Sequence, residues 1–441
     1  MTFFSLTFLL IFLPVSLLLY YTVPVSLKNP VLLLLSLAFY GLLEPRFFWL
    51  MLFSLLFDYG AACIVCSFRD RSGIGRLACF LSAVKSAAYV AYGVLCIRQG
   101  SPSPAGILIF TWSATGYVVD LYHKAAPFER NFLDFALYNC FFGRIFLGPY
   151  VKYTVIRPQL KEKRLSLASI SSGMVLLVQG MAKKVVLGDS LMGLYQTVSA
   201  IEERERTLLS SWTLLLSLAL GVYFVFSGYC DAARGLGHIF SFKMPRNIFF
   251  PLHTGSVREF VERFNISWLD YLRRYIGYPL AALHGSAVWQ GICTAVCLAF
   301  YGAWLSLTPR GILWGGFLAL LMLSEKYLYG KLLEKLPHLL RRLYAGLAVL
   351  LSFALLSQPS LHSSYVLIKT LFQFEAGLWY NDAIVYILLQ NYWALALGLL
   401  LSYPMIPRVS SFIRKRWPAC ANIFSVALNL GLITLTIMFL I

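Results

Sequence analysis

Few side chains in this 441-residue chain have the types and spacing that catalysis or metal binding would need. No spacing among the six histidines indicates a metal site. Of the nine cysteines, Cys63 and Cys66 have the CxxC spacing of redox and zinc sites, but they fall in a hydrophobic segment without a nearby histidine. Because a free cysteine packs as a small apolar residue, we interpret both as core residues.

The richest polar stretch runs from Phe226 to Leu280 and lies between two strongly apolar segments. It carries too many charges and chain breakers to cross a bilayer itself. A polar insertion between membrane spans is expected to fold against the bundle or to line a water-filled cavity. We therefore expect this stretch to form the floor of an active or binding site, at the base of a cytosolic funnel.

Within this stretch, residues 257–276 have the pattern of one amphipathic helix, suited to the membrane plane. A simple interfacial anchor is the alternative. Asn265 falls among the apolar residues of the pattern, so its amide is expected to point into the protein. A buried amide needs hydrogen-bond partners, so Asn265 is either a satisfied core residue or part of a cavity wall.

The composition places these residues in a membrane. Hydrophobic residues make up 59% of the chain, charged residues 13%, and the mean hydropathy is +0.73; soluble proteins have roughly a quarter of their residues charged. This predicts an all-α polytopic membrane protein. Runs long enough to cross lipid lie at 3–24, 29–43, 46–67, 75–96, 104–122, 167–199, 207–229, 286–308, 311–331, 338–357, 379–403 and 419–441.

A further run, 132–151, contains glycine, proline and arginine and is predicted to be a broken or re-entrant helix. The net charge of +18 follows from lysines and arginines in alternate loops, which predicts that those loops are cytoplasmic and that the N-terminus is outside. No basic patch accompanies a soluble binding motif, so no nucleic-acid partner is expected. Lys85 lies inside an apolar run and is expected either to snorkel or to pair within the protein.

The polar stretch also resembles the signature region of the membrane-bound O-acyltransferase (MBOAT) family. The similarity is greatest to the bacterial membrane proteins of alginate O-acetylation and teichoic acid D-alanylation. The matching residues, in order, are Phe226-Ser227-Gly228-Tyr229, Asp231, Gly235, Pro245, Asn247, Pro251, Glu259-Phe260, Arg263, Ile266-Ser267, Arg273 and Pro279-Leu280. The resemblance implies one transmembrane MBOAT-like domain over residues 1–441, with its signature at 226–318 and with re-entrant segments.

The resemblance also places two residues where the family has histidines. Asn265 stands at one such position, and Tyr301 stands at the position of the catalytic histidine. Tyrosine titrates near pH ~10, so it is a poor base at neutrality. It can still donate a hydrogen bond to a developing oxyanion, or carry an acyl group if it is activated; a packing tyrosine is the alternative. His238, His253 and His284 are candidates for a displaced base, and a solvated interfacial histidine is the alternative for each.

The same alignment suggests residues that bind substrate. They include two arginines that could meet an acidic carrier, coenzyme phosphates or anionic lipid headgroups. Asp231 is also placed to pair with Arg234, three residues on, which is the simpler explanation for its charge. The predicted binding residues are Ser227, Tyr229, Asp231, Asn247, Arg263, Arg273 and Trp314.

The resemblance therefore implies an O-acyltransferase of the cell membrane. It would pass an acyl group, expected to be acetyl, from a cytosolic acyl-CoA or acyl-carrier thioester toward a hydroxyl of an envelope polysaccharide or partner protein. The alternative is a catalytically degenerate relative that acts as a scaffold or acyl conduit. The expected partners are membrane lipid, an acyl-carrier protein and an extracytoplasmic transferase, with no metal and no tightly bound cofactor.

Overall fold

The computed structural model describes residues 3–68, 72–101, 106–163, 166–373 and 379–440, and this part of the chain contains helices and no β-strand. The predicted all-α class is thus confirmed. The chain divides into two compact units. Unit 1 comprises Met1–Gly180, Tyr229–Arg246 and Leu440–Ile441, and unit 2 comprises Met181–Gly228 and Asn247–Phe439. The single transmembrane domain over 1–441 stays a prediction.

Within the described ranges, ten helices are long and apolar enough to cross a membrane, as expected for a multi-pass membrane protein. They are Val25–Leu43, Pro45–Ser67, Gly73–Arg98, Leu167–Ser199, Leu208–Ile239, Ala287–Ser306, Pro309–Lys335, His338–Ser357, Asp382–Leu401 and Ile423–Leu440.

Two of the twelve predicted spans form shorter helices. The run 3–24 gives the apolar helix Phe8–Thr22, and the run 104–122 gives α5 (Ile107–Tyr122), although residues 104 and 105 lie outside the described ranges. Gly106 precedes α5 with φ of +69°, and a β-carbon there would lie 2.4 Å from the carbonyl oxygen of Ile145. Only glycine fits this position, and it fixes where α5 begins.

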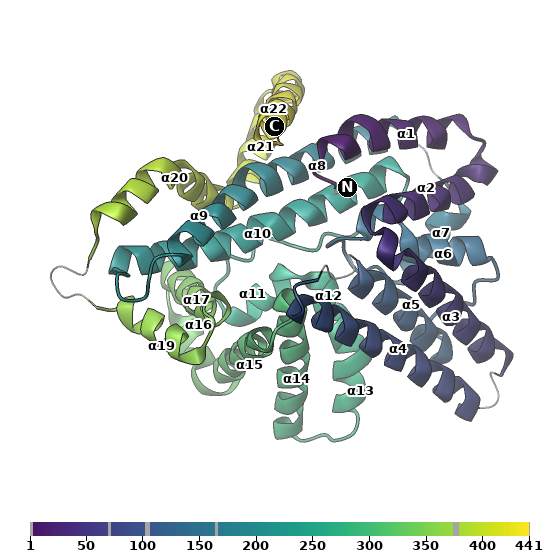
Figure 1. Ribbon diagram of the computed structural model, residues 1–441, viewed down its shortest axis with the longest axis horizontal. Helices are drawn as coiled ribbons and strands as arrows, with labels where there is room; N and C mark the ends of the chain where they lie inside the picture. Colours follow the sequence, from purple (N-terminus) through teal and green to yellow (C-terminus); the bar gives the residue numbers. More distant parts are fainter. Residues whose placement is uncertain (1–2, 69–71, 102–105, 164–165, 374–378, 441) are drawn as a thin grey trace. The chain divides into compact units, whose positions relative to one another are not determined.

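Unit 1 is built from helices at the N-terminal end of the chain, and α3, α4 and α5 pack against one another within it (Figure 1). The last residues of α10 (Leu208–Ile239), from Tyr229 onward, also belong to this unit. Its other helices are α1 (Leu13–Thr22), α2 (Lys28–Leu43), α3 (Phe48–Ser67), α4 (Ser72–Arg98), α6 (Phe132–Cys140), α7 (Tyr153–Lys161) and α8 (Leu167–Ala182).

A buried polar network joins α3, α4 and α5. Lys85 forms an ion pair with Asp58, and both side chains are buried. The Lys85 ammonium also donates to Ser54 Oγ at 2.8 Å, and Ser82 Oγ donates to Asp58 Oδ1 at 2.6 Å. Ser82 Oγ lies 3.1 Å from the hydroxyl of Thr115 on α5. Of the two possibilities for Lys85, the structure therefore confirms pairing inside the protein, as an ionisable side chain within a span requires.

The run 132–151 is a broken helix, as predicted. Helix α6 ends at Cys140, a short 3-10 turn follows at Phe142–Arg144, and no further helix begins before Tyr153. Arg144 is buried and donates to the carbonyl oxygen of Tyr138 in the last turn of α6, where a cation is favoured.

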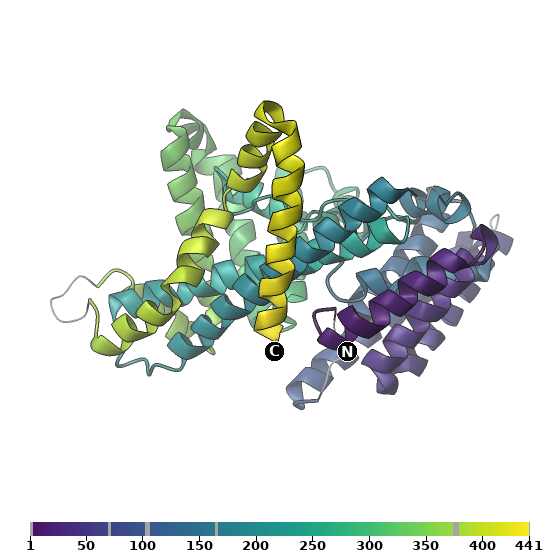
Figure 2. The ribbon, with the colours of Figure 1, turned by 90° about the horizontal axis from the view of Figure 1, so that it is seen from above.

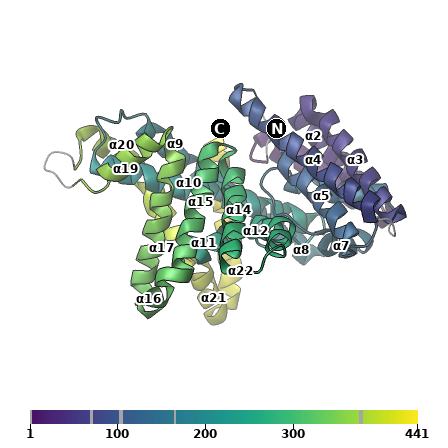
Figure 3. The same cartoon turned by 90° about the horizontal axis from the view of Figure 1, so that it is seen from below.

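Unit 2 contains the rest of the chain. Figure 3 shows α14 and α15 side by side, joined through Leu307 and Thr308. Figure 2 shows the C-terminal helix α22 in yellow; only 6% of its most apolar window is buried. The helices of unit 2 besides the first part of α10 are α9 (Asp189–Ser199), α11 (Val257–Phe264), α12 (Ile266–Leu272), α13 (Tyr278–Ala281), α14 (Ala287–Ser306), α15 (Pro309–Ser324), α16 (Gly330–Lys335), α17 (His338–Ser352), α18 (Ala354–Ser357), α19 (Leu361–Thr370), α20 (Asp382–Leu401), α21 (Met405–Arg416) and α22 (Pro418–Leu440).

The prediction of one helix over 257–276 is wrong. The helix breaks at Asn265, whose φ of −146° and ψ of 76° are not helical, so α11 and α12 are separate. A π-helical turn, Arg273–Gly277, follows α12. The apolar pattern is nevertheless kept across the break, because Phe264, Asn265 and Trp268 are all buried.

The Lys85–Asp58 pair makes a first testable prediction. In Lys85→Met, Asp58 stays buried without its cation, and we expect the free energy of unfolding in detergent micelles to fall by about 3 kcal/mol. The double variant Lys85→Met with Asp58→Asn should lose clearly less, because no charge remains buried and the amide still bonds the serines. The exposed Lys331→Met serves as control. Equal losses for the single and double variants would show that the pair does not act as a unit.

Candidate functional site

The start of α11 is held by hydrogen bonds from two directions. Ser256 caps the helix by accepting from the backbone N–H of Glu259 at 3.1 Å, and the Glu259 carboxylate accepts from the N–H of Gly255 at 2.8 Å. The buried carboxylate of Glu325 accepts from the N–H groups of Val257 at 2.7 Å and Arg258 at 3.1 Å. A carboxylate at a helix N-terminus is stabilising, so Glu325 ties α11 to the end of α15.

The break after α11 is satisfied by Asn247. Its backbone carbonyl accepts from the N–H of Ile266 at 3.0 Å, and its side-chain oxygen accepts from the N–H of Ser267 at 2.8 Å. Asn247 is only 2% exposed. The structure thus gives this predicted binding residue a capping position at the first turn of α12, where such a bond contributes about 1 kcal/mol.

Tyr301 and Asn265 lie together in unit 2. The Tyr301 ring stacks on Trp314, with centroids 6.2 Å apart and planes 20° apart. The Tyr301 hydroxyl interacts with the backbone of Asn265 but forms no hydrogen bond of normal geometry with any described residue. The side-chain nitrogen of Asn265 is also buried without a hydrogen-bond partner in the described part of the chain. Two buried donors therefore come together from the helix break and from α14.

Such unsatisfied donors are costly, and they can therefore mark a functional site. The third aromatic residue of the group, Trp314, is satisfied instead: its indole N–H donates to Ser352 Oγ at 2.9 Å. Trp314 is fully buried and also packs against Phe353. We interpret it as the platform that fixes the Tyr301 ring rather than as a group with free hydrogen-bonding capacity.

Three glycines bring α14 and α15 close enough for this stack. A β-carbon on Gly315 would lie 1.8 Å from the carbonyl oxygen of Leu298, and one on Gly302 would lie 2.0 Å from that of Gly311. Small residues permit such close backbone approach between membrane helices. The short connection suits the pairing, since Leu307 adopts a φ of 50° and Pro309 begins α15.

An aromatic group beside the break was not predicted from the sequence. Trp304, one turn beyond Tyr301, packs edge-on against Phe226 at 5.1 Å between centroids, and its ring lies 6.4 Å from that of Trp268. Phe226 also packs against Phe264. The sequence contained a signal for this aromatic group, because Phe264 and Trp268 flank Asn265 in the apolar pattern. Glu325 was missed too, and its only signal was a carboxylate at the end of an apolar run.

The predicted arginines are paired with carboxylates. Arg263 forms an ion pair with Glu259, four residues before it, and its guanidinium lies 5.6 Å from the centroid of the Phe249 ring. Arg273 donates to Glu262 Oε1 at 3.2 Å. Both arginines remain partly exposed.

The remaining binding residues divide between the units. Ser227, in unit 2, is buried and accepts from the ammonium of Lys183 at 3.3 Å. Tyr229 and Asp231 belong to unit 1. There the Tyr229 ring packs against Phe4 at 4.7 Å, and Asp231 pairs with Arg234 at 3.3 Å, the simpler of the two explanations for its charge.

The structure does not bring His253 and His284 to Tyr301. His284 is exposed in the loop before α14, and Tyr301 lies fourteen residues along that helix, a rise of about 21 Å. His253 precedes α11, at the end opposite Asn265, and its ring lies 3.9 Å from that of Tyr403. Burial, followed by the charges of Arg342 and Arg408, lowers the pKa of His253, so it stays neutral at neutral pH.

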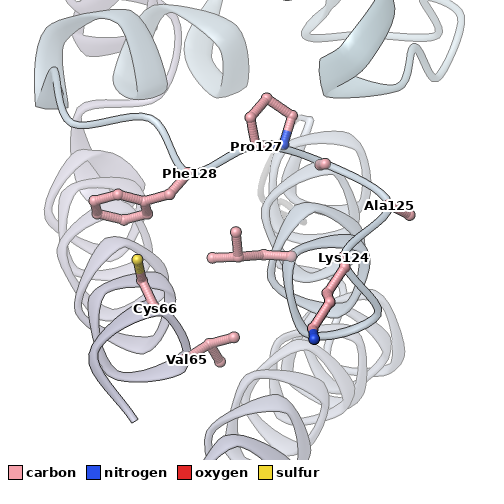
Figure 4. A pocket seen from close by; sticks show the side chains of 8 residues that line it. Val65, Cys66, Lys124, Ala125, Pro127 and Phe128 are labelled. Atoms are coloured by element: carbon pink, nitrogen blue, oxygen red, sulfur yellow. The ribbon is translucent and has the colours of Figure 1, made fainter. Parts of the chain in front are cut away.

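The described residues contain no group of three or more His, Cys, Asp or Glu side chains placed to hold a metal ion. Figure 4 shows a cavity of about 400 Å³ in unit 1, near the end of α3 and the segment after α5. Its walls include Val65, Cys66, Lys124 and Pro127. None of the residues predicted for chemistry or binding lines it.

Comparison with known proteins extends the family resemblance. No protein-family model matches the chain. A curated protein described as "Probable alginate O-acetylase AlgI" from Azotobacter vinelandii is 27% identical over 396 residues, which cover 85% of this chain and 78% of that protein. The protein of the same description from Pseudomonas aeruginosa is 26% identical over 398 residues, covering 86% and 76%.

A third relative is named for a different polysaccharide, peptidoglycan instead of alginate. The peptidoglycan O-acetyltransferase of Helicobacter pylori is 26% identical over 320 residues, covering 62% of this chain and 60% of that protein. All three relatives are named as O-acetyl-transferring proteins. The resemblance to membrane-bound O-acyltransferases is thereby confirmed over most of the chain.

The glycine contact between α14 and α15 gives a matched pair of variants. Gly315→Ala inserts a methyl group against the Leu298 carbonyl oxygen, so we expect the helices to separate and the protein to lose about 2 kcal/mol of stability. The neighbouring Gly316→Ala has nothing within 4 Å of the new methyl group and should behave as wild type. Thermal unfolding in detergent measures both, and equal melting temperatures for the two variants would refute the close packing.

Proposed function

We propose that this protein is a membrane O-acetyltransferase, which moves an acetyl group from a cytosolic thioester to a hydroxyl of an envelope polysaccharide. The observation that carries the proposal is the similarity over about 85% of the chain to proteins named for alginate O-acetylation, together with a relative named for peptidoglycan O-acetylation. A scaffold role is not favoured, because the named relatives transfer acetyl groups.

The transfer exchanges one acyl bond for another. The acceptor hydroxyl oxygen attacks the thioester carbonyl carbon, the new C–O bond forms, and the C–S bond breaks. The proton of the hydroxyl ends on the departing thiolate, so the products are an acetyl ester and a free thiol. Negative charge builds on the carbonyl oxygen in between, and donors aimed at that oxygen lower the barrier.

Tyr301 and Asn265 are the donors that we assign to this oxygen. The Tyr301 hydroxyl and the Asn265 amide nitrogen are buried, and neither forms a hydrogen bond of normal geometry with a described residue. Groups that are already held in place and already desolvated stabilise an oxyanion without reorganising at the moment of reaction. Trp314 fixes the ring that carries the Tyr301 hydroxyl.

In this assignment Tyr301 acts as a donor and not as a base. A tyrosine remains protonated at neutrality, which is the state that a donor requires. The leaving thiolate is the final proton acceptor, so a histidine at position 301 is not essential to the proton balance. This accounts for a site that keeps the scaffold suggested by the resemblance while it places asparagine and tyrosine at the two histidine positions.

The direction of transfer rests on charge. The basic residues in alternate loops support an orientation with the N-terminus outside and residues 226–285 on the cytoplasmic side, where an acyl-CoA or an acyl-carrier protein would deliver the thioester. The acceptor hydroxyl, on the polysaccharide itself or on an extracytoplasmic transferase, would reach the same site from the outer face. Ser227 and Arg263 are assigned to the donor side.

The Tyr301 hydroxyl can be tested alone. Tyr301→Phe keeps the ring on Trp314 and removes only the donor, so we expect acetyl transfer to fall roughly 10²- to 10³-fold with normal amounts of protein in the membrane. Ester-linked acetate, released by alkali from the polysaccharide of cells expressing each variant, measures the activity. The exposed Tyr365→Phe is the control.

Two results would count against the proposal. If deleting the protein caused no loss of acetate from the polysaccharide, the proposed acetyl-transfer activity would be rejected. If the deletion abolished acetylation but Tyr301→Phe acetylated fully, the protein would still be needed for acetylation. Tyr301 would then be rejected as a catalytic residue.

A further inference from the structure

A cavity of about 370 Å³ in unit 2 is lined by three basic side chains and by mostly apolar residues. The basic residues are Arg258 on α11, Arg273 in the π-helical turn after α12, and Lys326 after α15. These residues come from separate elements, so the cavity is a product of the fold. It lies beside the N-terminal half of α14, next to α11 and α12.

No acidic side chain lines the cavity to balance the charge of these three basic residues. Glu262 Oε1 accepts from Arg258 Nε and from Arg273 at 3.2 Å each, so one carboxylate serves both arginines. Among the described residues Lys326 has no acidic partner, and its ammonium lies 4.8 Å from the centroid of the Tyr327 ring. Two arginines thus share one carboxylate and Lys326 has none, which favours a ligand that carries a phosphate.

The rest of the lining is mostly apolar, apart from Gln290 and Thr294, and much of it comes from a helix with exposed apolar side chains. It includes Cys293, Cys297 and Leu298 of α14. Only 28% of the most apolar part of α14 is buried, and Val288 and Ile292 on the same helix are 75% and 46% exposed. In a bilayer these side chains contact acyl chains.

We propose that this cavity binds an anionic glycerophospholipid. Its phosphate lies against Arg273 and Lys326, and one acyl chain follows the exposed face of α14. A basic pocket at the end of membrane helices is suited to such headgroups. Since Leu298 lies in the cavity wall one turn before Tyr301, the bound lipid braces the helix that carries the Tyr301 ring. The inference rests on the cavity and the membrane spans and does not depend on acetyl transfer.

Native mass spectrometry of the purified full-length protein in detergent tests the proposal. We expect one phosphatidylglycerol to bind wild type, at least tenfold more tightly than phosphatidylcholine. The double variant Arg273→Gln with Lys326→Gln should weaken phosphatidylglycerol binding at least tenfold. The matched control, Lys331→Gln with Lys335→Gln, removes two exposed cations outside the cavity and should bind as wild type does.

Equal binding of phosphatidylglycerol by wild type and the Arg273/Lys326 variant would overturn the proposal. So would displacement of the lipid by coenzyme A, which would make the cavity a site for the phosphates of a soluble donor. A photoactivatable phosphatidylglycerol provides a measurement on wild type alone. Cross-links within residues 290–298 are expected, and cross-links confined to other segments would contradict the assignment.

Discussion

The break between α11 and α12 leaves backbone amides among apolar side chains, and the protein must satisfy them without water. At the break, Asn247 accepts from the first two amides of α12 through its backbone and side-chain oxygens. At the other end of α11, Glu325 accepts from the first two amides of that helix. In an apolar surrounding an unsatisfied amide costs several kcal/mol, on the order of 4–8 kcal/mol for transfer to hydrocarbon. Asn247 therefore stabilises the break at its α12 side, while Glu325 holds the far end of α11, and the break brings the backbone of Asn265 to the Tyr301 hydroxyl.

The second constraint is the approach of α14 to α15. Gly302, Gly311 and Gly315 remove the side chains that would separate the two backbones, so the Tyr301 ring can stack on Trp314. The ring is then held by packing, while its hydroxyl forms no hydrogen bond of normal geometry with a described residue. The resulting site holds the Tyr301 ring rigidly and leaves buried hydrogen-bond donors available to a substrate. In a soluble surface loop water would satisfy the same donors, and they would have little to offer a substrate.

The sequence predicted the class of fold and most of the spans, because runs of some twenty apolar residues have few alternatives. It also predicted that Asn265 faces the interior and that Lys85 is paired or snorkelling. It did not predict the break at Asn265, since an amphipathic pattern continues through a single non-helical residue. Glu325, Trp304 and the capping position of Asn247 depend on contacts between residues far apart in the chain, which no local pattern contains. His253 and His284 were chosen by residue type alone, and the structure places both away from Tyr301.

The central claim is that Tyr301 and Asn265 act on one oxygen, and a double-mutant cycle tests it most directly. Acetyl transfer would be measured for wild type, Tyr301→Phe, Asn265→Ala and the double variant, in membranes that contain equal amounts of protein. If both donors bind the same oxyanion, the double variant should lose less than the product of the two single losses, with a coupling of about 1 kcal/mol or more. Strictly multiplicative losses, with a coupling below about 0.3 kcal/mol, would contradict a shared site.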